Sequence, residues 1–184
     1  PENCDKRDVR KTLPMGLKLA TFEKKTRGNT VNLSLALRIG DLANAKGSGL
    51  APVTVASMLM RGSKFHTRAQ IADEFDRLRS RVSMQSGANS CSVSIETTRA
   101  NLIPTLQLVM EILRHPAWDP KEFELDKQET LAGAEQMRSD PESLADNVLS
   151  RHLNPYPKDD PRYSETPDEL VELAKQLTLD QVKA

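Results

Sequence analysis

The chain has 184 residues, and its 26 Lys and Arg residues balance 26 Asp and Glu residues, so its formal net charge is zero. This balance argues against a dedicated nucleic-acid-binding protein, which normally carries a basic excess. No apolar run approaches the roughly 20 residues that a membrane-spanning helix requires, so no membrane segment is predicted.

Two cysteines, Cys4 and Cys91, are far too few for a disulfide scaffold. We expect both to be unpaired, with Cys91 packed inside a strand. The first residues contain no signal-peptide core and no initiator Met, which is typical of a domain taken from a longer chain, so the compartment is left unassigned.

Two strands are predicted near the start of the chain. Residues 31–39 alternate with a period of two, and every odd position is apolar, which predicts a strand with one face on a core. Residues 17–22 are a plausible partner, because residues 27–30 between the two segments carry turn chemistry.

A second strand pair is predicted further along. Apolar and polar residues alternate along residues 91–97, in the same way as along residues 31–39. Residues 81–85 precede this segment. Residues 86–90, which include Gly87, are typical of the turn of a hairpin.

Between the two strand pairs lies an almost wholly apolar segment, residues 50–62. Thr54 and Ser57 are its only polar side chains before Arg61, so the pattern predicts a helix that is buried on most sides. Gly62 supplies its stop.

Two amphipathic helices are predicted around the second strand pair. Thr67 and Gln70 form a capping box, and Ile71, Phe75 and Leu78 follow at helical spacing. A later helix carries one apolar stripe and ends before Pro116. The stripe comprises Leu102, Leu106, Val109, Met110 and Leu113.

The last third of the chain is predicted to be helical. Start signals at Asp119, Asp140 and Thr166 open helices that run to about residues 138, 152 and 177. A proline-rich surface loop, residues 154–162, interrupts them. Thr178 opens a further capping box just before the chain ends, which indicates a chain truncated inside a domain.

This order of elements predicts an α+β fold, in which an antiparallel β-sheet has helices packed on one face. Strand pairs with helices clustered between and after them are the basis of that prediction. No internal repeat and no low-complexity segment is evident.

The residues offer no catalytic site of a familiar type. His66, His115 and His152 each lack a second histidine at the spacing of a helical zinc site, so we interpret them as surface or capping residues. Cys91 has no cationic neighbour on its strand that would lower its pKa. Ser63 does not follow a strand as the nucleophile of a Gly-x-Ser-x-Gly elbow does.

Carboxylates are frequent in the predicted helix that follows Asp119. A set of them on an amphipathic helix is normally a solvated face, and we interpret it that way here. The set comprises Glu122, Glu124, Asp126 and Glu129.

Several short segments, taken in order, resemble the pitrilysin/insulinase-type zinc metallopeptidases, or inverzincins, whose zinc helix carries His-x-x-Glu-His. The resemblance covers the chain from about Leu13 to Ala184. The segments are residues 13–19, Gly40–Asp41 after the first alternating strand, 58–63, 75–78, 94–98 and 152–158.

Laid on this chain, the resemblance places the two zinc-binding histidines at Val53 and Ser57 and the catalytic glutamate at Ala56. The third ligand, a glutamate, falls at about Ala132–Ala134, with Glu129 and Glu135 out of register. A zinc hydrolase needs metal ligands and a general base, so this departure implies a domain without zinc, cofactor or catalytic residues.

The resemblance also implies an architecture. Large single-chain members contain four homologous domains, two in each half of a chamber that encloses peptides, and only the first domain carries the zinc motif. This chain is most similar to the third domain. Residues 1–12 are then a linker, and residues 13–184 are an inactive peptidase-like domain that lacks its closing strands.

Three functions remain open at this point. The favoured one is a non-catalytic domain of a zinc metalloendopeptidase, whose partners are the catalytic half, in the same polypeptide or a paired subunit, and peptide substrates. A second is an assembly scaffold related to the core proteins of respiratory complexes, and a third is an enzyme with an unrecognised site. A periplasmic location is expected from bacterial relatives, and the missing strands predict a weak homodimer.

Overall fold

The structure is a computed structural model that describes residues 8–22, 29–38, 47–87 and 89–184. Two compact units are present, Pro1–Thr30 and Val31–Ala184, and each is described by itself. Cys4, the Gly40–Asp41 segment and the first half of the turn predicted at residues 27–30 lie outside the described residues.

The first unit contains a β-hairpin. Strand β1 (Asp8–Thr12) pairs antiparallel with β2 (Lys18–Phe22), and the 3-10 helix η1 (Pro14–Gly16) joins them. The Leu13 N–H donates to the Leu17 carbonyl at 2.7 Å, which closes the connection.

Two features of this hairpin differ from the expected elements. Residues 8–12, which lie within the linker expected over residues 1–12, form strand β1. The strand at residues 18–22 has β1 as its hydrogen-bonded partner, where we expected residues 31–39. A tight connection of five residues favours pairing with the sequence neighbour, because its closure costs little entropy.

The second unit is built on a three-stranded sheet with the order β3–β5–β4. The strands are β3 (Thr30–Arg38), β4 (Arg81–Gly87) and β5 (Ser90–Thr98), and β4 pairs antiparallel with β5 as the alternation predicted. Residues Cys91, Val93 and Ile95 of β5 are buried, while Ser94 and Glu96 on the opposite face are exposed.

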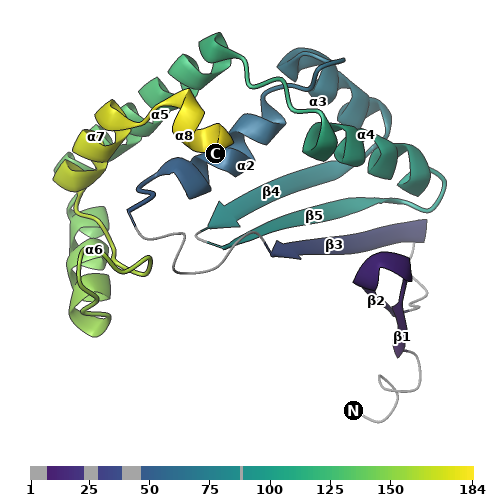
Figure 1. Ribbon diagram of the computed structural model, residues 1–184, viewed down its shortest axis with the longest axis horizontal. Helices are drawn as coiled ribbons and strands as arrows, with labels where there is room; N and C mark the ends of the chain where they lie inside the picture. The colour runs from purple at the N-terminus through teal and green to yellow at the C-terminus, as the bar shows by residue number, and fades with distance from the viewer. Residues whose placement is uncertain (1–7, 23–28, 39–46, 88) are drawn as a thin grey trace. The chain divides into compact units, whose positions relative to one another are not determined.

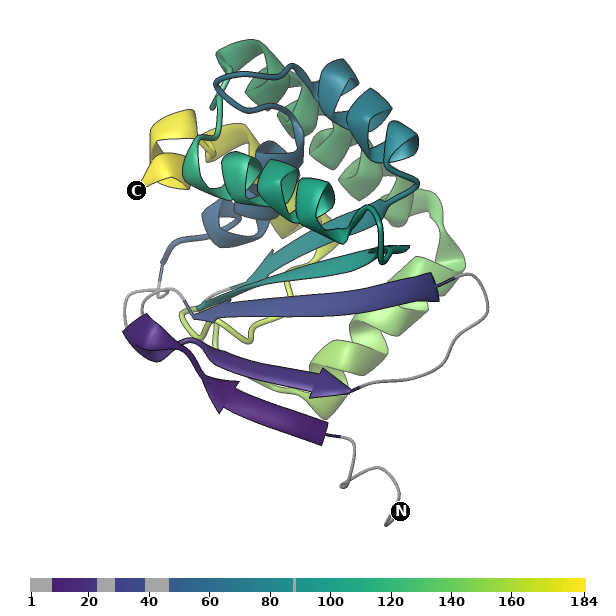
Figure 2. The ribbon, with the colours of Figure 1, turned by 90° about the vertical axis from the view of Figure 1, so that its right-hand side faces the viewer.

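Helices cover one face of this sheet, as the sequence predicted (Figures 1 and 2). They are α2 (Ala51–Met60), α3 (Arg68–Arg77) and α4 (Leu102–Arg114). Their apolar residues and those of β5 form the first core cluster, which comprises Leu59, Ile71, Phe75, Val93, Ile95, Leu108, Val109 and Ile112.

The buried face of α4 differs from the predicted stripe. Met110 is exposed, and the buried residues are Thr105, Leu108, Val109 and Ile112. Thr105 lies on the buried face, where its hydroxyl forms a hydrogen bond with the buried Ser80 hydroxyl at 2.7 Å. A prediction based on apolar residues alone does not detect a buried hydroxyl that is hydrogen-bonded in this way.

Four helices complete the second unit: α5 (Pro120–Ser139), α6 (Pro141–Leu153), α7 (Pro167–Gln176) and α8 (Leu179–Lys183). Their predicted start signals are confirmed, with Thr166 and Thr178 forming complete capping boxes. A second core cluster joins α2, α5, α7 and α8 and comprises Leu50, Ala51, Met58, Phe123, Ala174, Leu177 and Val182.

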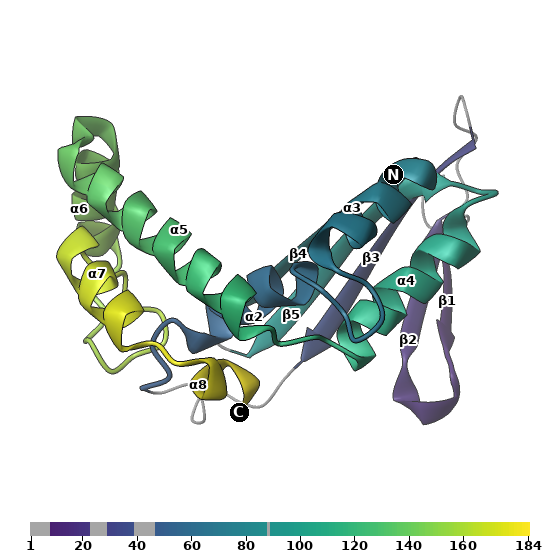
Figure 3. The same ribbon diagram turned by 90° about the horizontal axis from the view of Figure 1, so that it is seen from above.

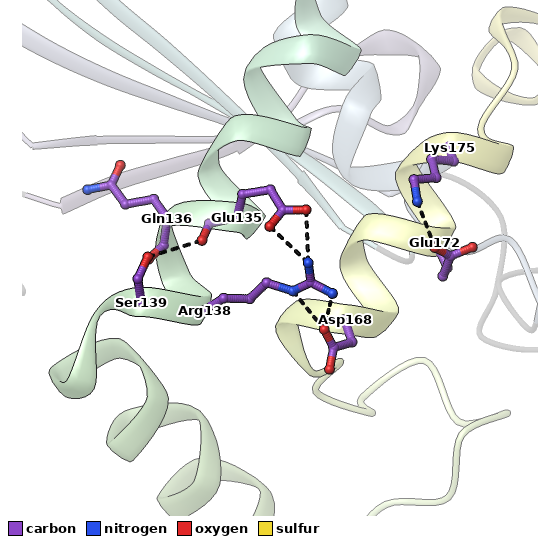
Figure 4. A network of polar contacts seen from close by, with 7 residues as sticks. All are labelled: Glu135, Gln136, Arg138, Ser139, Asp168, Glu172 and Lys175. Atoms are coloured by element: carbon purple, nitrogen blue, oxygen red, sulfur yellow. Dashed lines mark hydrogen bonds and ion pairs between the residues drawn. The ribbon is translucent and has the colours of Figure 1, made fainter.

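Helices α5 and α7 lie side by side (Figures 1 and 3). Arg138 near the end of α5 links them, because its guanidinium donates to Glu135 on the same helix and to Asp168 on α7 (Figure 4). No helix in the described part of the chain has the length and apolar character needed to cross a membrane.

Candidate functional site

Helix α2 is the element on which the resemblance places the zinc motif. Val53 is 51% exposed, whereas Ala56 is buried. The Ser57 hydroxyl donates to the Thr54 carbonyl at 3.0 Å, so its hydrogen bond is made within the helix. Of these three side chains, only that of Ser57 carries a polar atom, and none is a usual zinc ligand.

The first turn of α2 is completed by a strand residue. The Ser86 hydroxyl, near the end of β4, accepts the Ala56 N–H at 2.9 Å and donates to the Pro52 carbonyl at 2.6 Å. It therefore stands between the two groups that an ordinary i to i−4 helical bond would join. The sequence placed Ser86 in a turn and gave no signal of this contact.

The third-ligand region lies on α5. Ala134 is buried and Ala132 is exposed, and neither has a side-chain atom that could bind a metal. Across the described residues, no three His, Cys, Asp or Glu side chains are grouped so that they could hold a metal ion. The absence of zinc chemistry stays a prediction based on the residue types.

A buried arginine at the end of α2 corrects the interpretation of the α5 carboxylates. The Arg61 side chain is 6% exposed, and it donates to Asp126 at 3.0 Å, Glu122 at 3.3 Å and Glu129 at 2.5 Å. Asp126 is itself buried and Glu122 is partly buried, so these two do not lie on a solvated face, whereas Glu129 is exposed as predicted. Glu124 is exposed, as predicted.

The surroundings of Arg61 favour its charged form. Burial by itself lowers the pKa of Arg61, but the charge of Asp126 and the hydrogen bonds from Arg61 to Glu129 and Glu122 raise it overall. The guanidinium is therefore firmly charged, and the cluster joins α2 to α5 rather than offering a free acid or base.

A second polar cluster joins the loop after α2 to α4. The Ser63 hydroxyl donates to Glu111 Oε1 at 2.5 Å, and His66 Nδ1 lies 2.7 Å from the same oxygen. Burial by itself raises the pKa of Glu111, but these hydrogen bonds, with the charges of His66 and His115, lower it.

This cluster does not have the geometry of a nucleophilic site. Ser63 and His66 both contact Glu111, whereas a serine nucleophile needs the histidine as its own hydrogen-bond partner. The Ser63 oxygen also accepts the backbone N–H groups of Phe65 and His66, which fixes the loop.

The other singled-out residues lie where the sequence placed them. His115 is the C-cap of α4 and contacts Phe65 edge to face, and His152 lies exposed in the last turn of α6. Cys91 is a free thiol buried in β5, and burial raises its pKa, so it is a poor nucleophile.

A cavity of about 650 Å³ opens beside the start of α2. It is bounded by residues 47–53, by the loop 158–165 and by α7. Val53 lines it, and Gly49 and Leu173 approach each other at its wall. Sequence reasoning did not find this cavity, because its walls come from segments more than 100 residues apart.

Comparison with solved structures identifies the fold. The inactive domain of a peptidase M16 from Pseudomonas fluorescens superimposes with a TM-score of 0.76 and 22% identity, over 96% of this chain and 42% of that one. The chain has the fold of an M16 peptidase domain. The periplasmic protease PqqL from Escherichia coli gives a TM-score of 0.73 and 16% identity, over 98% of this chain and 20% of that one.

Pitrilysin has the same domain fold, with a TM-score of 0.62 and 16% identity over 92% of this chain and 18% of that one. This chain therefore spans less than half of the length of each of these three structures. No protein-family model and no curated protein matches its sequence. The predicted α+β fold is confirmed.

Proposed function

We propose that the chain is a non-catalytic domain of a larger zinc metalloendopeptidase, and that it forms part of the half that encloses peptide substrates. The observation that carries this proposal is the pairing of an M16 domain fold with Val53, Ala56 and Ser57 on helix α2. The scaffold is present while the positions of the zinc motif carry small or apolar side chains.

The length of the similar structures supports a role within a larger protein. This chain covers 20% of the periplasmic protease PqqL, and 42% of an M16 structure described as an inactive domain. In this proposal zinc belongs to the catalytic half of the parent protein, residues 13–184 act as one wall of its chamber, and the periplasm is the expected compartment.

The first experiment tests the domain by itself. The purified chain is incubated with zinc and dialysed, its metal content is measured by elemental analysis, and its hydrolysis of a quenched fluorogenic peptide is followed. We expect no stoichiometric zinc and no hydrolysis. One zinc retained per chain, or peptide cleavage that a chelator abolishes, would overturn the proposal.

The second experiment tests the role in the parent. Peptide turnover by the catalytic half alone is compared with turnover after addition of the polypeptide that carries this chain. We expect turnover to rise when the enclosing half is present. Unchanged turnover, together with formation of a stable complex, would favour the alternative of an assembly scaffold with no part in proteolysis.

A further inference from the structure

The cavity beside the start of α2 has the dimensions of a binding site. Its volume of about 650 Å³ lies within the roughly 300–1,000 Å³ of ordinary ligand pockets. Its walls belong to the helix that the resemblance aligns with the zinc motif, to the loop 158–165 and to α7. The function proposed above assigns nothing to it.

The inner wall of the cavity is apolar. Leu50, Pro52 and Val53 come from the start of α2, and Pro161 and Leu173 face them from the other two segments. Val53 is 51% exposed, whereas five of the ten residues of α2 are buried. An exposed aliphatic residue inside a hollow is available to cover the apolar part of a ligand.

The backbone brings these walls together closely. Gly49 has φ +56°, a conformation that favours glycine, and a Cβ built at this position would lie 3.5 Å from Leu173 Cδ2. The chain can therefore pass against α7 here without a side chain filling the space between them.

The rim of the cavity is acidic. Among the lining residues that the structure describes are six carboxylates and one cation, Lys158. The carboxylates are Asp159, Asp160, Glu165, Asp168, Glu169 and Glu172. Four of them form ion pairs, Asp160 with Arg162, Asp168 with Arg138, Glu169 with Lys158 and Glu172 with Lys175, so most of this negative charge is balanced.

Two of these carboxylates have contrasting surroundings. Glu169 is hydrogen-bonded by Lys158, by the Thr166 N–H at 2.9 Å and by the Tyr163 hydroxyl at 2.9 Å. The Lys158 contact, followed by the others, lowers the pKa of Glu169 to about 2, so it is ionised at neutral pH. By contrast, the Glu165 carboxylate forms no ion pair within the described part of the chain.

We propose that this cavity binds a lysine or arginine side chain of an extended peptide. The aliphatic stem packs on Val53 and Leu50, while the cationic head lies against the acidic rim at Glu165. This inference rests on the proposed function, since it makes the non-catalytic domain a subsite that selects basic peptide segments for the enclosed chamber.

Lys158 is an internal competitor for such a ligand. Its side chain is 76% exposed, and its ammonium contacts Glu169 on the cavity rim. Removing this cation raises the negative potential of the rim, so it should strengthen the binding of a basic peptide. The two kinds of substitution therefore give opposite results, which loss of folding cannot imitate.

The experiment uses fluorescence anisotropy with the purified chain and three labelled peptides that differ only in carrying lysines, glutamates or serines at the same positions. We expect the lysine peptide alone to bind, and more weakly as salt is raised. E165Q should weaken binding about two- to fivefold, the loss typical of one exposed charge pair, and K158Q should strengthen it. E124Q is the matched control, because it removes an exposed carboxylate of α5 that does not line the cavity.

Equal binding of the three peptides, or E165Q affinity equal to that of E124Q, would overturn the subsite. Amide resonances of residues 48–53 should also shift when the lysine peptide is added, and shifts confined to other surfaces would contradict the assignment. Failure here leaves the zinc and turnover experiments unaffected, so the subsite and the non-catalytic role are tested separately.

Discussion

Replacing Arg61 with methionine should destabilise the domain strongly. The Arg61 side chain is 6% exposed, and Asp126, its partner at 3.0 Å, is 10% exposed. Methionine would fill much of the space of the arginine stem but leave the Asp126 carboxylate buried without a cation. Breaking a buried ion pair on one side typically costs about 3–5 kcal/mol, a large fraction of the roughly 5–15 kcal/mol of a whole domain.

The loss should be measured by urea unfolding, followed by far-ultraviolet circular dichroism and by the fluorescence of Trp118, which packs against both core clusters. At about 2–4 °C per kcal/mol for a domain of this size, the melting temperature should fall by roughly 10 °C. The double variant R61M/D126L removes both charges and should recover part of the loss.

The control is R77A, which breaks the exposed pair between Arg77 and Glu74 and should change stability little. The reasoning is refuted if R61M unfolds at the urea concentration of R77A. It is also refuted if the losses of R61M and D126L simply add in the double variant, because an ion pair couples its two members.

Three further predictions concern α2, the acidic rim and the open face of the sheet. S86A should lower the free energy of unfolding by about 1–3 kcal/mol, because the Ala56 N–H loses its acceptor. Amide hydrogen exchange at Ala56 should accelerate, and an unchanged exchange rate would contradict the hydrogen bond from Ala56 to Ser86. The folded-state pKa of Glu169 is about 2 against an ordinary 4.5, so its contribution to stability is complete above pH 4.5 and is lost as the pH falls towards 2. E169Q should therefore flatten the pH dependence of the unfolding free energy in that window, and an unaltered slope would exclude Glu169 as its source. In the parent protein, N32D and S34D on the exposed face of β3 should alter peptide turnover if that face lines the chamber, and unchanged kinetics would remove both residues from the wall.

The helices were predictable because their signals are local. Thr67, Thr166 and Thr178 each accept a hydrogen bond from the backbone N–H three residues later, so a few adjacent residues specify where each helix starts. The hairpin of β4 and β5 was predictable for a similar reason, since alternation and a short turn fix its register.

The contacts that were missed depend on residues far apart in the sequence. Arg61 and Asp126 are 65 positions apart, and the pattern of α5 alone could not distinguish a carboxylate facing water from one facing a buried guanidinium. Ser86 reaches the Ala56 N–H across 30 positions. The cavity likewise forms only when the start of α2 and residues 158–176, more than 100 positions away, are brought together.

Helix α2 and strand β4 share one hydroxyl, and this has a mechanical consequence. Because Ser86 completes the hydrogen bonding of Pro52 and Ala56, the opening turn of the helix cannot tilt unless the tip of the hairpin follows it. A peptide that binds against Val53 would therefore contact a rigid junction between the helix and the hairpin. Such a junction can hold a bound peptide in one register without changing its own conformation.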